Sequence, residues 1–131
     1  MRRRSVPLAL APVLLAACLT SPTLSGFPPA RSASGVEARL RVGGQEIRGE
    51  LLEASDSGFV VRQSPQIVFV PISVVRSARF AGIGHVTVNP PDADRLLTVR
   101  HSSRFPAGIP RSVLPELLRQ SGQREIAVVR E

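Results

Sequence analysis

Apolar and charged residues alternate with a period of two over residues 36–42, where every even position is apolar and every intervening position is charged. This alternation is typical of a β-strand with one buried face. Gly43-Gly44 then predicts a hairpin turn, and residues 47–52 predict a second strand in which Gly49 marks a bend or a bulge. The pattern over residues 36–52 therefore predicts a bent β-hairpin.

Short apolar runs separated by turn residues continue the pattern. Ser55-Asp56-Ser57-Gly58 and Ser64-Pro65 predict turns. Between and after them we expect three further strands, at residues 59–62, 67–70 and 77–81. A short 3₁₀ turn is expected at residues 72–75, before the last of these strands. The chain from residue 36 is thus predicted to be mainly β.

The C-terminal part changes in character after Asn89-Pro90-Pro91, which predicts a break. Asp92 or Asp94 is expected to cap a helix that runs to about His101. A loop at residues 105–108 separates it from a second helix, which we expect to begin at a Ser112 cap and to run to about Gln120, before the stop signal of Gly122. Residues 86–88 are open between strand and loop, and residues 126–129 predict a final strand that could join the sheet at an edge.

Three segments together resemble the small β-barrels of the Sm-like and SH3-like kind. They are a glycine-bearing second strand (Gly49-Glu50-Leu51-Leu52), a turn with an apolar third strand (Asp56 to Val61) and the step from Val70 to Val75. The resemblance covers residues 36–83 and implies a small, bent, five-stranded barrel, to which two short helices and a final strand are added. It implies no particular function, because such barrels have many.

The N-terminus carries the features of an export signal. Arg2, Arg3 and Arg4 follow Met1, and residues 5–17 are almost entirely apolar. This stretch is shorter than the about 20 apolar residues that a membrane-spanning helix needs, and Pro7 and Pro12 interrupt it. We therefore expect residues 1–17 to be a signal peptide rather than a membrane span.

The apolar stretch ends in Leu15-Ala16-Ala17-Cys18, which resembles the lipobox of bacterial lipoproteins. The resemblance implies cleavage after Ala17 and attachment of diacylglycerol to the thiol of Cys18, the only cysteine of the chain. Two or three acyl chains would anchor the protein without spanning the membrane. Leu19 departs from the aspartate that retains Gram-negative lipoproteins at the inner membrane, so in a Gram-negative host it favours the outer membrane, on its periplasmic face.

Residues 18–35 are rich in Pro, Ser, Thr and Gly and have no apolar periodicity, which predicts a lipid-anchored flexible linker. The domain is then expected to occupy residues 36–131. The net charge of +7 includes Arg2, Arg3 and Arg4, which would leave with the signal peptide, and all 17 basic residues are Arg. The remaining excess is spread along the chain, which is more typical of an ordinary charged surface than of a nucleic-acid-binding face.

Candidate catalytic and metal-binding residues are few. His85 and His101, with Asp92 and Asp94, could form a metal site or an acid–base pair, but nothing in their spacing favours one. A triad composed of Ser102, His101 and Asp56 lacks the Gly-x-Ser-x-Gly elbow, and Gly82-Ile83-Gly84 is more typical of a turn after a strand than of a phosphate-binding loop. We therefore expect no enzyme activity, no metal and no cofactor.

The sequence thus predicts a lipid-anchored protein of the cell envelope that acts as a binding or structural module, with an envelope protein or another envelope component as its partner and no nucleic acid. Two alternatives stay open. An envelope hydrolase would depend on His85 or His101. An Sm-like RNA-binding barrel, expected only if the chain is not exported, would use Arg76, Arg79, Arg100 and Arg104.

Overall fold

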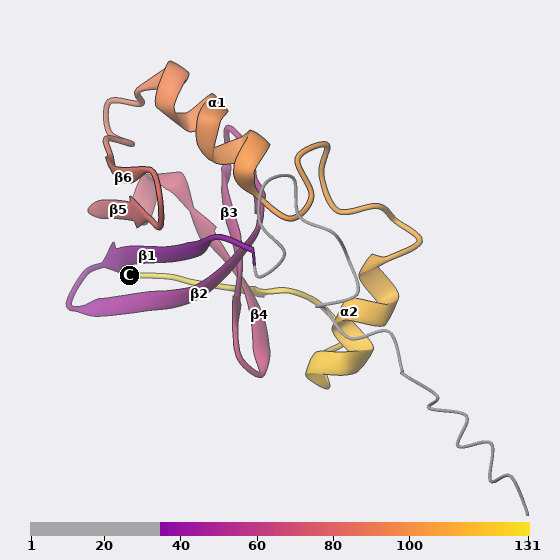
Figure 1. Ribbon diagram of the computed structural model, residues 1–131. Coiled ribbons are helices and arrows are strands. Elements are labelled where there is room, and N and C mark those ends of the chain that lie inside the picture. Colours follow the sequence, from indigo (N-terminus) through magenta and orange to yellow (C-terminus); the bar gives the residue numbers. More distant parts are fainter. Residues whose placement is uncertain (1–34) are drawn as a thin grey trace, which may run out of the picture.

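A single twisted sheet organises the chain in the computed structural model, which describes residues 35–131 (Figure 1). The strand order is β6-β5-β1-β2-β3-β4-β7, and every neighbouring pair is antiparallel except β4 and β7, which are parallel. The strands are β1 (Glu37–Val42), β2 (Gln45–Ala54), β3 (Gly58–Gln63), β4 (Gln66–Pro71), β5 (Ser77–Phe80), β6 (Gly84–Val86) and β7 (Ala127–Val128).

The first hairpin and the long strand β2 shape this sheet. Gly43 in the β1–β2 turn has φ +57°, a conformation that glycine adopts without the usual steric cost. The bulge predicted at Gly49 lies further along β2, where the register with β3 shifts between Leu51 and Glu53. Gly49 meets a different requirement: a Cβ there would lie 2.0 Å from the carbonyl oxygen of Arg62 on β3. The glycine therefore permits a close approach of two backbones.

Short helices connect and follow the strands. The 3₁₀ turn η2 (Ile72–Val74) separates β4 from β5, as predicted. Helix α1 (Ala93–Ser102) has Asp92 as its N-cap, with the carboxylate accepting a hydrogen bond from the Arg95 amide at 3.2 Å. Helix α2 (Leu114–Ser121) ends at Gly122, which has φ +70°. The Ser112 cap was wrong, because the N-cap residue is Val113 and no side chain caps this helix.

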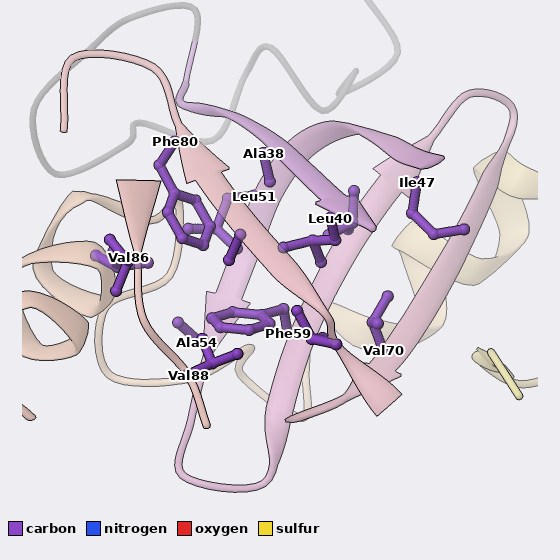
Figure 2. Close-up of a cluster of buried hydrophobic side chains, with 14 of the residues drawn as sticks. Ala38, Leu40, Ile47, Leu51, Ala54, Phe59, Val70, Phe80, Val86 and Val88 are labelled. Carbon is purple, nitrogen blue, oxygen red and sulfur yellow. The ribbon is translucent and has the colours of Figure 1, made fainter. Parts of the chain in front are cut away.

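The main core lies on the inner face of the bent sheet (Figure 2). The alternating positions of β1 place Ala38, Leu40 and Val42 inside, as the period of two predicted. Phe59 of β3 and Phe80 of β5 meet across this interior with ring centroids 5.5 Å apart and planes tilted by 53°. Helix α1 covers one end of the core with Val99, which is fully buried.

A second, smaller apolar cluster lies on the other side of strands β2, β3 and β4. Leu117 of α2 is fully buried there against Leu52, Val60 and Ile67. Strands β2 to β4 are therefore covered on both faces, whereas α2 lies away from β5 and β6 (Figure 1). The outward faces of β1, β5 and β6 carry exposed polar residues instead.

The mainly β class, the two helices and the final strand are confirmed, and β7 joins the sheet at its edge beside β4. The closed five-stranded barrel is not confirmed, because the sheet has seven strands and, over residues 35–131, no pairing joins its two edges. Residues 86–88, which the sequence left undecided between strand and loop, begin at the end of β6. Strand β6 is an additional strand beyond the predicted five. Within the same residues, neither helix has the length and apolar character needed to cross a membrane.

Candidate functional site

A pocket of about 310 Å³ lies between α1 and the adjoining ends of β2 and η2. Its walls are mainly apolar, and a few polar side chains reach it, which is the usual character of a small-ligand site. The lining residues are Ala54, Ser55, Asp56, Ile72, Val88, Asn89, Pro91, Ala93, Leu96, Leu97 and Arg100.

Local contacts hold α1 over this pocket. The Asn89 side-chain amide donates to the carbonyl oxygens of Ile72 and Val75, at 3.1 and 3.3 Å. The segment before α1 is thereby tied to η2, and the Asp92 cap then starts the helix. The segment from Asn89 to Asp92 is thus hydrogen-bonded to η2 at its start and to the first turn of α1 at its end. These bonds fix the position of α1 relative to η2.

The chemistry of the pocket is that of an apolar cleft with charges of both signs in its lining. Leu97, which lines the pocket, is 49% exposed, so part of its apolar side chain is accessible there. Asp56 comes from the β2–β3 turn and Arg100 from α1, so the two charges reach the pocket from different elements. The arrangement suits an apolar group that carries a polar or charged end, and it contains no nucleophile–base pair.

The histidines and acids singled out in the sequence do not form a site together. His85 is exposed on β6, His101 is exposed in the last turn of α1, and Asp92 is engaged as the helix cap. Asp94 lies in the first turn of the same helix. No group of three or more His, Cys, Asp or Glu side chains is placed to bind a metal within residues 35–131.

The composed triad and the glycine segment have structural roles. Ser102 is buried, and its hydroxyl donates to the Thr98 carbonyl at 2.8 Å. Asp56 lies in the β2–β3 turn, on the pocket wall. Gly82-Ile83-Gly84 forms the turn that leads from β5 into β6, with no helix after it, so it lacks the architecture of a phosphate loop.

The four arginines proposed for RNA binding occupy four different surroundings. Arg76 is paired with Glu131 at 2.7 Å, Arg79 lies on the outward face of β5, and Arg100 lines the pocket. Arg104 is only 3% exposed. An arginine that binds RNA has to be exposed, so the sequence-based interpretation of Arg104 as a surface residue was wrong.

Arg104 forms a buried ion pair with Glu50 of β2. The side chains are 2% and 15% exposed, respectively, and Nη1 of Arg104 has no hydrogen-bond partner. The backbone places this arginine, because the Arg104 amide donates to the Leu51 carbonyl at 3.1 Å beside the shift in register. Sequence reasoning missed the pair because nothing local links positions 50 and 104.

A row of basic side chains crosses the outward faces of four neighbouring strands. His85 on β6 is opposite Arg79 on β5, Arg79 is opposite Arg39 on β1, and Arg39 is opposite Arg48 on β2. All four residues are exposed. Like charges directly opposite each other destabilise a sheet, so the three arginines of this basic row (His85, Arg79, Arg39 and Arg48) lower the stability of the sheet.

Glu37 relieves part of that repulsion. Its carboxylate accepts from Nε of Arg39 at 2.9 Å and lies 3.1 Å from Nε of Arg48. The hydrogen bonds from Arg39 and Arg48 hold the pKa of Glu37 below its usual value. Within residues 35–131, Arg79 forms no ion pair. It lines, with Arg39 and Glu37, a depression of about 360 Å³ that extends over the β5–β6 turn.

Helix α2 carries its own exposed charges. Glu116 in its first turn accepts from Arg119 at 2.6 and 2.9 Å and from the Gln120 amide at 3.1 Å. The Arg119 hydrogen bonds, followed by the Gln120 bond, lower the pKa of Glu116 to about 2. These contacts lie on the exposed side of α2, away from the side of the helix that buries Leu117.

Comparison with protein-family models, with curated proteins and with solved structures finds no match to this chain. The lipobox residues Leu15, Ala16, Ala17 and Cys18, the signal peptide and most of the linker lie outside the described residues. The geometry of the pocket, the buried pair and the basic row is therefore the structural basis for any proposal.

Proposed function

We propose that this protein is a lipid-anchored component of the bacterial cell envelope whose folded domain is a binding module. The pocket under α1 supports the binding role, because it combines apolar walls with Asp56 and Arg100. Leu15-Ala16-Ala17-Cys18, after a short apolar stretch and a basic start, supports the anchor. On the exported side, at the outer membrane if the host is Gram-negative, the partner would be another envelope protein or component.

We further propose that the domain belongs architecturally with the small Sm-like and SH3-like barrels. The supporting observation is the consecutive strand order β5-β1-β2-β3-β4, with a 3₁₀ turn between β4 and β5 and a long, bent β2. In such a barrel the two remaining strands would be additions at the edges. The architecture supplies a scaffold and carries no function of its own.

No specific observation favours the two alternatives. For a hydrolase, His85 and His101 lie on different elements, and Ser102 is buried and bonded within α1. For single-stranded RNA, the chain has no Trp or Tyr. Phe59 and Phe80 are buried in the core, and Phe69 and Phe105 pack, partly buried, against the second apolar cluster. Exposed aromatic side chains are the usual stacking platforms for single strands.

The anchor is tested by Cys18→Ala in the native host. We expect the native protein in the membrane fraction to begin at Cys18 and to carry the mass of two or three acyl chains. The variant should stay unprocessed and unlipidated, because the thiol that accepts the lipid is gone. Ser21→Ala is the matched control, and it should leave processing unchanged.

Intact-mass measurement of the purified proteins decides the matter. A native N-terminus other than Cys18, or a mass without added lipid, contradicts the proposal. So does recovery of the intact chain from the cytosol with Met1 and the leading arginines still attached, an outcome that would favour the RNA-binding alternative.

A further inference from the structure

The outward face of β1, β5, β6 and the beginning of β2 has an excess of positive charge. Besides the basic row, Arg41 is exposed on β1, opposite Glu46 on β2 and Ser77 on β5. Four arginines, Arg39, Arg41, Arg48 and Arg79, thus share this face with Glu37 and Glu46. Glu50, opposite Glu37 on the same side, is paired with the buried Arg104. Arg95 of α1 brings one more guanidinium to the border of this face, where it donates to the Ile83 carbonyl at 2.6 Å.

The geometry of the face is set by strand spacing. Neighbouring strands lie about 4.8 Å apart, so the four members of the basic row span about 14 Å in one line. Alternation along each strand points them to the same side of the sheet, since directly opposed residues share a face. The face is therefore an extended positive surface, and its depression beside Arg39 and Arg79 is edged by the backbone of the β5–β6 turn.

Repulsion within the row indicates what the face would bind. Glu37 is hydrogen-bonded to Arg39 and paired with Arg48, and it leaves Arg79 without a recorded ion pair among residues 35–131. An external anionic surface would neutralise these charges, and a sheet that keeps like charges in register gains from such a partner. Among residues 35–131 this face exposes no Phe, and the chain has no Trp or Tyr, so the large aromatic platforms on which bases stack are missing and phosphate groups are favoured over nucleic-acid bases.

The position of the anchor selects among anionic surfaces. Arg39 lies four residues after Gly35, where the described chain begins, which is about 13 Å along β1. Residues 19–34 separate that point from Cys18, and a chain of this length reaches at most about 55 Å. A tether of this length holds the domain at high effective concentration beside the bilayer, so that weak charge interactions suffice for docking.

We propose, on the basis of the proposed lipid anchor, that the basic row docks the domain onto a bilayer surface rich in anionic phospholipid headgroups. Each arginine near such a surface strengthens association about fivefold. Docking then orients the molecule: the outward faces of β1, β5 and β6 lie against the headgroups, and α2, which covers the outward face of β2, β3 and β4, lies away from β5 and β6 (Figure 1).

The test uses the lipidated, full mature protein reconstituted into vesicles. Cys18 is the only cysteine and would carry the lipid, so Ser77→Cys on the same face supplies the only free thiol for a fluorescent donor. Energy transfer to acceptor-labelled headgroups reports docking. It is compared between phosphatidylcholine vesicles and vesicles that also contain phosphatidylglycerol.

We expect strong transfer only with phosphatidylglycerol, and its loss in about 1 M salt, where the screening length is about 3 Å. In an Arg39→Gln/Arg79→Gln background the ratio of docked to undocked domain should fall about 25-fold. The matched control is Arg111→Gln/Arg124→Gln, which removes two exposed arginines beside α2 and should leave the transfer unchanged.

Three results overturn the inference: equal transfer in both vesicle types, equal loss in both double variants, and release of the domain by a single-stranded oligonucleotide but not by inorganic phosphate, which would assign the face to nucleic acid. A failure of the anchor is separate, because the intact mass then lacks lipid before any vesicle is added. In that case co-sedimentation of the purified chain with the same two vesicle types still tests the face, through the difference between the two double variants.

Discussion

The buried pair between Arg104 and Glu50 yields a prediction whose size follows from its surroundings. Removing one member of a buried ion pair usually costs about 3 to 5 kcal/mol, because the other charge is left without compensation. Arg104→Met leaves Glu50, which is 15% exposed and can recover some hydration. It also removes Nη1, whose burial without a partner costs about 1 to 3 kcal/mol in the native protein. We expect a net loss of about 2 kcal/mol.

Glu50→Gln should cost more, about 4 kcal/mol, because it leaves the guanidinium of Arg104 charged and 2% exposed. The double variant Glu50→Leu/Arg104→Met removes both charges and should recover most of the native stability. The order of the three losses is thus a consequence of the unequal burial of the two partners.

Urea unfolding of each variant measures these losses. Far-UV circular dichroism is the suitable signal because the chain contains no Trp or Tyr. Arg119→Met is the control, since it breaks an ion pair in which the arginine side chain is 68% exposed, and solvent-exposed pairs contribute little to stability. Losses below about 1 kcal/mol for both single variants, or additive losses in the double variant, would refute the reasoning.

Two further predictions concern α2 and the pocket. The folded-state pKa of Glu116 is lowered to about 2 from 4.5, so its contribution is present at neutral pH and disappears as the pH falls from about 5 toward 2. The urea midpoints of native protein and Glu116→Gln should therefore differ at pH 7 and converge at pH 2; a constant difference would contradict this. In the native envelope, a photo-crosslinking residue at Leu97 should capture a partner, whereas one at Val128, 53% exposed on β7, should not. Identical products from both sites would argue against the pocket.

Local signals account for the elements that sequence analysis predicted well. The alternation over residues 36–42, the Gly43-Gly44 turn and the Asp92 cap each depend on neighbours within a few positions, and each is confirmed. The Ser112 cap failed because Val113 begins α2 without a side-chain cap, and packing of Leu117 against β2, β3 and β4 stabilises that helix instead. A capping signal is weaker than burial of an apolar face.

The candidate sites show the opposite balance. The residues that sequence reasoning selected, His85, His101, Asp92 and Asp94, were chosen for their chemistry, and the fold distributes them among a strand, a cap and one helix. The pocket draws its lining from β2, η2 and α1, which are separated by up to about half the described chain, so no spacing in the sequence reveals it.

The sequence by itself determined where most of the strands, turns and helices lie, because periodicity, glycines and caps act over a few residues. It also carries the whole of the proposed export and lipidation signal, in residues 1–18. Only the tertiary structure decided that Glu50 meets Arg104, that Arg39 stands between Arg48 and Arg79, and that α1 forms a pocket with the end of β2. Strand register and burial bring distant residues together, and those long-range contacts depend on the packing of all the elements at once.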